Sequence, residues 1–171
     1  MTQLKTGIDK AIFIWGVFCL VGFSLWQFVR PEDFFGTINV AWIIASIVGL
    51  AAMFWFVNNL FSNKTNAPIA WTWIAVVVVG EILSIGLWLK WFDLGPVNYA
   101  VLWAGLMGIG FLLTGHGWIS KMPYYVAGIL CLAIMALILL KVPPIAGFQW
   151  AFVPLGLASG LPQIYDSAIR K

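Results

Sequence analysis

The sequence predicts an all-α integral membrane protein, a bundle of six transmembrane helices with its N- and C-termini in the cytoplasm. Hydrophobic residues make up 63% of the chain and charged residues only 9%, whereas a soluble domain has roughly 25% charged residues. So few charges cannot cover a surface that faces water. The chain also divides into six apolar segments, each close to the ~20 residues that cross a bilayer as a helix.

The six segments form one transmembrane domain and are separated by short polar or proline- and glycine-containing breaks. Each segment is continuously apolar rather than alternating, which favours helices over a β-barrel. The first segment is long for a signal-peptide core and no cleavage site follows it, so we expect it to be retained. The predicted spans are residues 11–29, 38–61, 68–92, 98–119, 122–141 and 145–165.

The charge distribution sets the expected orientation in the cell membrane. With a cytoplasmic N-terminus and six spans, six basic residues fall at inner positions and three at outer positions. This asymmetry agrees with the positive-inside rule. Because the basic residues are scattered singly, they predict no nucleic-acid site, and the expected partner is the lipid bilayer. The inner residues are Lys5, Lys10, Lys64, Lys121, Arg170 and Lys171, and the outer ones are Arg30, Lys90 and Lys141.

The eleven tryptophans are interpreted as an aromatic belt at both membrane interfaces. The alternative is an aromatic cage around a cation or a flat ligand. Trp15 lies deeper and departs from the belt. In this belt, the tryptophans expected at the inner ends of the spans are Trp55, Trp71, Trp73 and Trp118. Those expected at the outer ends are Trp26, Trp42, Trp88, Trp91, Trp103 and Trp150.

A short pattern recurs in the chain. Trp-x6-Gly-Phe-x-Leu occurs at residues 15–25 in the first segment and again at residues 103–113 in the fourth. Three spans in each half would make the halves inverted in the membrane, an arrangement common in transporters. The alternative is chance recurrence in a sequence rich in these residues.

Glu81 is the one ionisable side chain near the middle of a predicted span. A carboxylate at that depth costs roughly 2.5–3.5 kcal/mol on insertion scales. It is therefore either protonated or turned into the bundle, where Ser84 lies one turn away on the same face. The functional hypothesis is an ion- or substrate-binding site formed by Glu81 and Ser84. The alternative is a neutral Glu81 that hydrogen-bonds helices together.

The sixth segment has an unusual density of prolines and glycines. Pro154 and Pro162 each free a backbone carbonyl one turn earlier, and Gly156 and Gly160 form a close-packing face. Freed carbonyls at membrane depth are tolerated where they are buried in protein or line a wet cavity. We interpret these four residues as a hinge or packing element, either a broken helix beside a substrate path or a static, kinked packing helix.

Pro162-Gln163, followed by a basic end, resembles the proline–glutamine signature of the PQ-loop sugar and amino-acid transporters. The resemblance covers about residues 161–171. It differs from the family pattern, which places this signature earlier in a three-helix unit. The resemblance implies a Pro-Gln hinge in alternating access, and it makes Gln163 a candidate substrate-binding residue.

The sequence offers little support for a cofactor or for catalysis. His116 is the single histidine, which excludes a haem pair or a multi-histidine metal site; it is a candidate proton-relay residue or a solvated helix cap. Cys19 and Cys131 both fall inside apolar segments and are expected to be buried and free. Nucleophilic catalysis would need His116 with a partner such as Asp166, and no activated serine is marked. No metal site or cofactor is identified, and the sequence favours a non-enzymatic role.

Two functions therefore remain open. The first is a small transporter or channel for a solute or ion that uses an intramembrane carboxyl group, with or without homo-oligomerisation. The second is a non-catalytic structural subunit of a larger membrane complex, which fits the scarcity of ionisable groups. A water-accessible cavity at Glu81 would favour the first, and a dry, hydrogen-bonded Glu81 the second.

Overall fold

The chain folds into six α-helices, seen in a computed structural model that describes residues 7–29, 34–57, 61–62, 64, 66–92, 96–117, 122–146 and 148–169. The described residues are helical apart from short turns, which confirms the predicted all-α class. The helices are α1 (Gly7–Trp26), α2 (Phe34–Phe56), α3 (Asn66–Trp88), α4 (Pro96–Gly117), α5 (Met122–Leu139) and α6 (Phe148–Ile169).

The helix boundaries differ from the predicted spans by less than two turns. α1 ends at Trp26 because the following three residues form a hydrogen-bonded turn. α3 ends at Trp88, and Lys90, two residues later, has the left-handed conformation (φ 58°). The next amide, Trp91 N, donates back to Gly86 O at 2.8 Å, which satisfies a carbonyl at the helix end. Arg30 and Lys121, which flank predicted spans, lie outside the described residues.

Four helices are long and apolar enough to cross a membrane: α1, α3, α5 and the Tyr99–Gly117 part of α4. The comparable apolar stretch of α2, Val40–Phe56, is shorter. α6 is long enough but more polar, and its polar residues Gln163, Asp166 and Ser167 are buried within the protein. The chain therefore has the helix lengths and composition of a membrane protein.

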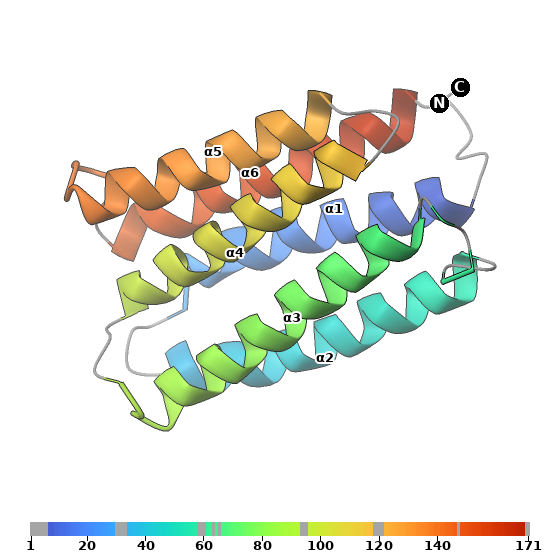
Figure 1. Cartoon of the computed structure of the whole chain (residues 1–171). Coiled ribbons are helices and arrows are strands. Elements are labelled where there is room, and N and C mark those ends of the chain that lie inside the picture. The colour runs from blue at the N-terminus through green and yellow to red at the C-terminus, as the bar shows by residue number, and fades with distance from the viewer. Residues whose placement is uncertain are drawn as a thin grey trace.

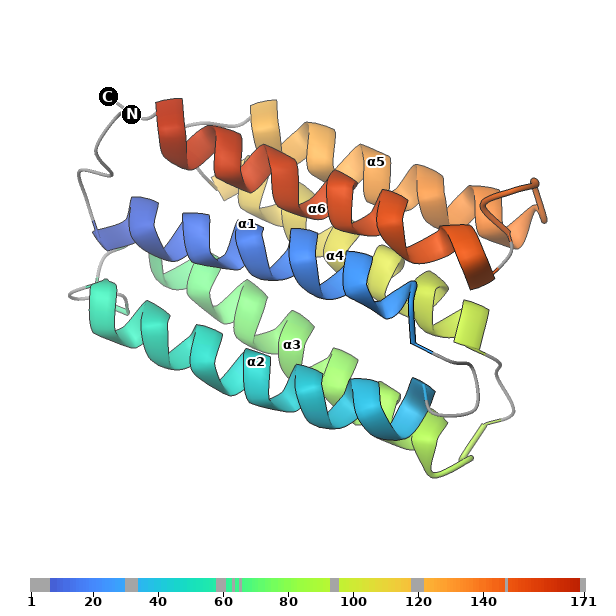
Figure 2. The same cartoon turned by 180° about the vertical axis from the view of Figure 1, so that it is seen from behind.

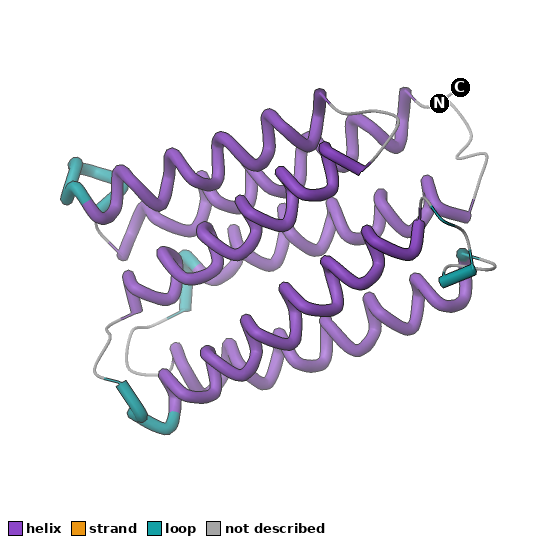
Figure 3. The backbone as a smooth tube through the Cα atoms, in the orientation of Figure 1, coloured by secondary structure: helices purple, strands orange, loops and turns teal. Residues whose placement is uncertain are grey.

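The helices pack in two layers of three (Figures 1 and 2). One layer contains α3, α4 and α5, and the other contains α2, α1 and α6. Consecutive helices run antiparallel (Figure 1), and the helix ends that follow one another in the sequence lie at the same end of the bundle (Figure 3). We call the end where α1 begins and α6 ends the terminal end, and the opposite end the far end.

Glycines bring α1 and α6 into backbone contact. A Cβ atom built on Gly160 would lie 2.6 Å from Gly16 O, and one on Gly156 would lie 2.9 Å from Leu20 O. Gly160 and Gly156 thus act as the close-packing face that the sequence predicts. α4 and α5 pack in a similar way, because a Cβ on Gly128 would lie 3.0 Å from Gly108 O.

Tryptophans connect α1 to α2, and α3 to α4, in a reciprocal pattern. Each of these helices contains Trp-x6-Gly, and each indole covers the glycine of the neighbouring helix. The recurring pattern noticed in the first and fourth segments therefore extends to α2 and α3, whereas α5 contains no tryptophan. The contacts are Trp15 on Gly49, Trp42 on Gly22, Trp103 on Gly80 and Trp73 on Gly110.

The interpretation of the tryptophans as an interfacial belt is wrong for three of them. Trp26, Trp42 and Trp103 are 4%, 5% and 1% exposed and belong to the main hydrophobic core. Their neighbours across the bundle are glycines and other rings, so indoles fill the space between helices there. Trp55, Trp71, Trp88 and Trp91 are exposed, as a belt requires. Trp73 is half-buried, packs against the core and donates to Thr114. The side chains of Trp118 and Trp150 lie outside the described residues.

Candidate functional site

A cavity of about 60 Å³ lies between all six helices in the terminal half of the bundle. Its lining extends to the ends of three helices, through Ile8, Val57 and Asn66, so it reaches the terminal end. The volume is a few times the roughly 10–15 Å³ that holds one water. The lining residues are Ile8, Ala11, Ile12, Trp15, Met53, Val57, Asn66, Ile69, Ala70, Trp73, Thr114, Tyr124 and Gln163.

Gln163 on α6 presents an amide to this cavity. Its Nε2 donates to Ser159 O at 3.0 Å and to Cys19 Sγ at 3.7 Å. Because a carbonyl can only accept, the bond to Ser159 O fixes which way the amide is turned. The Oε1 atom makes no hydrogen bond with the described residues, and it is the amide atom left for the cavity. Cys19, like Cys131, is buried and free as expected.

Three other polar side chains of the wall are hydrogen-bonded into the protein, whereas Trp15 Nε1 is buried without a partner among the described residues. Trp73 Nε1 donates to Thr114 Oγ1 at 2.9 Å, and Thr114 Oγ1 donates to Gly110 O at 2.8 Å. The Tyr124 hydroxyl donates to Asp166 Oδ2 at 2.9 Å. Asp166 has no exposed surface, so an acidic side chain is held inside the bundle directly behind a cavity-lining tyrosine.

An aromatic cluster fills the bundle on the far side of the cavity. Its rings come from α1, α2, α4 and α6 and are at most 5% exposed. Trp42 and Trp103 meet at its centre with ring centroids 5.4 Å apart, and Trp26 contacts Trp42 at 4.8 Å. We call this group the aromatic plug, and it consists of Phe23, Trp26, Trp42, Tyr99, Trp103 and Phe152.

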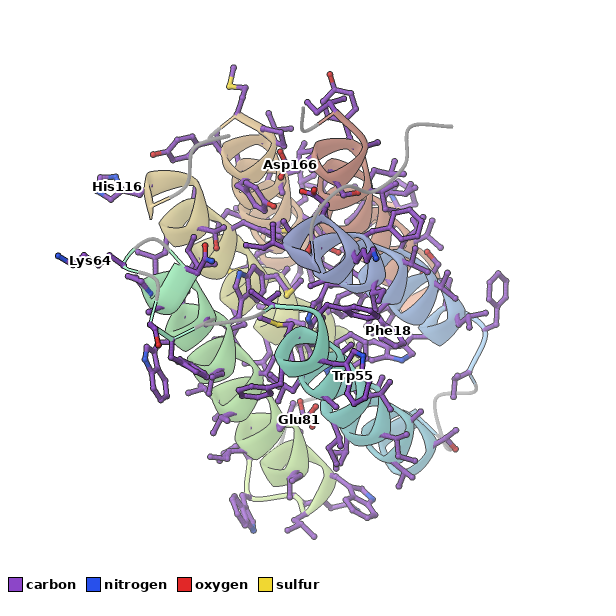
Figure 4. All side chains as sticks on the ribbon, turned by 90° about the vertical axis from the view of Figure 1, so that its right-hand side faces the viewer. Phe18, Trp55, Lys64, Glu81, His116 and Asp166 are labelled. Carbon is purple, nitrogen blue, oxygen red and sulfur yellow. The ribbon has the colours of Figure 1, made fainter. Side chains whose placement is uncertain are left out.

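Glu81 lies away from the cavity, between α3 and α2 (Figure 4). Its Oε1 accepts a hydrogen bond from Ser46 Oγ at 3.1 Å, and its Oε2 is buried without a partner among the described residues. Ser46 is the hydrogen-bond partner of Glu81, and Ser84 Oγ accepts instead from Trp103 Nε1 at 3.1 Å. Glu81 lines neither the cavity nor the outer grooves beside α1 and α5. Its arrangement fits the interhelical hydrogen bond better than the ion site.

The sequence candidates His116, Pro154 and Pro162 do not line the cavity. His116 is exposed and extends from the end of α4 (Figure 4), whereas Asp166 is fully buried, so the two do not form a catalytic pair. α6 is one continuous helix through Pro154 and Pro162, so neither proline breaks it. Groups of three or more metal-ligating side chains are absent from the part of the chain that the structure describes.

Sequence reasoning about single residues missed Tyr124, Thr114 and Asp166 as parts of one site. A signal was present on α6, where Ser159, Gln163 and Asp166 follow one another at helical spacing. That spacing places polar groups on a single face of an otherwise apolar helix. Their partners on α4 and α5 could not be found in this way, because the pairing of helices decides which residues meet.

No protein-family model matches the chain, and no curated protein sequence or solved structure matches it. The likeness to the PQ-loop transporters is therefore limited to the Pro162-Gln163 dipeptide and its basic flank. The features that bear on the function of the chain are the cavity, the aromatic plug and the buried polar groups.

Proposed function

We propose that the chain is a multi-pass cell-membrane protein that moves a small solute or ion across the bilayer, with the cavity as its binding chamber. The terminal end then faces the cytoplasm, in line with the basic residues expected there. The observation that carries the proposal is a cavity lined by all six helices, whose lining reaches the helix ends at the terminal end, while the rings of the aromatic plug fill the bundle toward the far end.

A carrier that opens to one side of the membrane at a time needs a binding chamber that is accessible from one end and closed toward the other. A solute enters from the terminal end, and the aromatic plug prevents a continuous path. Contact between α1, α2 and α4 in the plug is made by side chains, whereas α1 and α6 are in backbone contact through glycines. We infer that the α2–α3 pair moves relative to the α1–α6 pair when the plug opens, because ring contacts separate more readily than a glycine-packed helix pair.

The intramembrane carboxyl group of the mechanism is Asp166 rather than Glu81. Asp166 reaches the chamber through the hydroxyl of Tyr124. Glu81 is hydrogen-bonded to Ser46 on the other side of the bundle. The sequence predicted that this carboxyl group lies on α3, whereas the proposal assigns it to α6.

Uptake into reconstituted vesicles tests the proposal with two variants. We expect Gln163→Leu to reduce uptake at least tenfold for whichever member of a panel of small ions and neutral solutes the wild type carries. The leucine removes the acceptor that faces the cavity. Glu81→Gln should retain uptake within about twofold, because glutamine keeps the acceptor for Ser46 Oγ and Glu81 does not line the chamber. Leu161→Ala, at an exposed position of the same helix, is the matched control.

Wild-type uptake at the level of empty vesicles for every solute would contradict a transport function. Uptake that survives Gln163→Leu but is lost in Glu81→Gln would place the site between α2 and α3. Both variants must first elute as monodisperse protein with wild-type helical content, so that a folding defect is not taken for lost transport.

One observation favours the structural-subunit function as the second candidate. Glu81 is hydrogen-bonded between helices and does not line the cavity. α2 presents the exposed apolar side chains Ile44, Ile47 and Val48. A partner subunit could cover that face. Co-purification of a stoichiometric membrane protein from native membranes would support this role, and a chain that purifies alone and transports solute would exclude it.

A further inference from the structure

We propose that the outer groove between α5 and α6 binds an anionic phospholipid, with one acyl chain along the groove and the headgroup at the terminal end. The groove has a volume of about 480 Å³ and shares no lining residue with the cavity. The inference therefore goes beyond the proposed function and holds whether or not the cavity carries a solute. The groove is lined by Met122, Pro123, Val126, Leu161, Pro162, Tyr165 and Ile169.

The walls of the groove are apolar and lie on the outer surface of the bundle. Met122 and Val126 of α5 are exposed, as are Leu161 and Ile169 of α6. The phenol of Tyr165 is the one polar side chain among the lining residues. Covering such a surface with hydrocarbon removes apolar area from water without leaving a polar group unsatisfied, so an acyl chain suits these walls.

The length and direction of the groove match one leaflet of a bilayer. On α6 its lining extends from Ile169, the last residue of the helix, to Leu161 in the interior of the helix. This distance is about 12 Å at the 1.5 Å rise per residue of an α-helix. Half of a hydrocarbon core is about 15 Å thick. An acyl chain in the groove therefore has its headgroup at the terminal end and its methyl end near the middle of the bundle.

The headgroup end of the groove has the positive charge that an anionic lipid needs. Arg170 and Lys171 directly follow Ile169 in the sequence, and consecutive Cα atoms are only about 3.8 Å apart. Both basic residues are therefore tied to the wall of the groove. α5 begins at Met122, so the positive end of its helix dipole adds to this charge. One turn before Ile169, the exposed hydroxyl of Tyr165 can donate to a phosphate or ester oxygen.

The described acids at the terminal end are inside the bundle rather than on its surface. Asp9 and Asp166 are 3% and 0% exposed, and Asp166 accepts a hydrogen bond from Tyr124. Lys64 and His116 instead project outward at this end, whereas Asp166 lies between α5 and α6 (Figure 4). The described surface of the terminal end thus presents basic side chains, which favour an anionic headgroup over a zwitterionic one.

Native mass spectrometry of the purified full-length protein in detergent tests the inference. The protein is titrated with phosphatidylglycerol and with phosphatidylcholine that has identical acyl chains. We expect the first phosphatidylglycerol to bind at least fivefold more tightly, because one basic residue near an anionic lipid surface is worth about fivefold in affinity. Inorganic phosphate should not displace the lipid, since it lacks an acyl chain. This comparison needs the wild type alone, so no variant has to fold.

A variant that fills the groove locates the acyl chain. Val126→Phe places a larger side chain in the groove and should weaken the binding of both lipids at least fivefold. The matched control is Ile129→Phe, at an exposed position of α5 that does not line the groove. This control should bind both lipids like the wild type.

A pair of charge variants locates the headgroup. Arg170→Gln combined with Lys171→Gln should weaken the binding of phosphatidylglycerol at least fivefold and leave that of phosphatidylcholine unchanged. The matched control, Lys90→Gln combined with Lys141→Gln, removes the same two charges from the far end, where α3 and α5 end. It should keep the wild-type preference for phosphatidylglycerol.

Three results would overturn the inference. The first is equal affinity of the wild type for the two lipids. The second is a control variant that weakens lipid binding as much as the variant it is matched to. The third is a dimer that Val126→Phe dissociates and whose formation phosphatidylglycerol does not affect, because a second copy of the chain would then occupy the groove.

Discussion

Replacing Trp42 and Trp103 together by alanine is expected to make reconstituted vesicles leak small ions that the wild type retains. These two indoles meet at the centre of the aromatic plug, and both are almost fully buried. Alanine at both positions leaves a space where two rings stood, directly beyond the chamber. Water can then connect the terminal end to the far end, because the wall of the chamber already has polar groups.

The leak is measured by the release of a trapped ion from vesicles with equal protein content. Each truncation of a buried tryptophan costs roughly 3–5 kcal/mol of stability, so the double variant must first pass a check of helicity and monodispersity. If it is too unstable, Trp103→Phe with Trp42→Leu preserves most of the volume and should leak less. The matched control replaces two exposed indoles, Trp55 and Trp71. A folded double variant that is as tight as this control would show that the plug is not the barrier.

Replacing Gly160 by leucine is expected to give the largest loss of stability of any single change in α6. The new Cβ would lie 2.6 Å from Gly16 O and 2.7 Å from Leu20 N, and neither backbone atom can move aside without separating α1 from α6. Overpacking typically costs about 1–3 kcal/mol, and more where nothing can yield. Separation would also displace Gln163, so substrate binding should weaken in any protein that still folds.

The control for Gly160→Leu is Gly36→Leu. A Cβ on Gly36 would meet nothing within 4 Å, so this change should leave the thermal midpoint in detergent nearly unchanged. The measurement is the thermal or denaturant midpoint of both variants in the same detergent. Equal midpoints for the two variants would contradict a backbone contact between α1 and α6.

The helices were predictable from the sequence because long apolar runs and their polar breaks are local features. The six predicted spans overlap the six helices, and Gly156 and Gly160 pack as expected. Tryptophan placement was less predictable. From the sequence alone, an indole near a helix end fits the membrane interface as well as it fits the core. Its burial depends on whether a glycine of the neighbouring helix leaves room for the ring, as Gly80 does for Trp103.

The candidate site was predictable only in part, because it depends on which helices are neighbours. Gln163, one of the sequence candidates, lines the cavity, and its binding role stays a prediction. Glu81 attracted attention as the isolated acid of an apolar helix. Asp166 carries the same chemistry but lies near a helix end, where acids are common, and its bond to Tyr124 joins α6 to α5 in a way that spacing along the chain does not reveal.

The most direct test of the account is thiol labelling from each side of the membrane. The buried Cys19 and Cys131 are first replaced by alanine. Single cysteines are then introduced by Met53→Cys, at a position that lines the cavity, and by Ala104→Cys, at a position beside the aromatic plug. We predict that a membrane-impermeant thiol reagent labels Met53→Cys from the side of the termini only, and that it labels Ala104→Cys from neither side. Failure to label Met53→Cys from that side, or labelling of both positions from the opposite side, would contradict a chamber that opens at the terminal end and is closed by the aromatic plug.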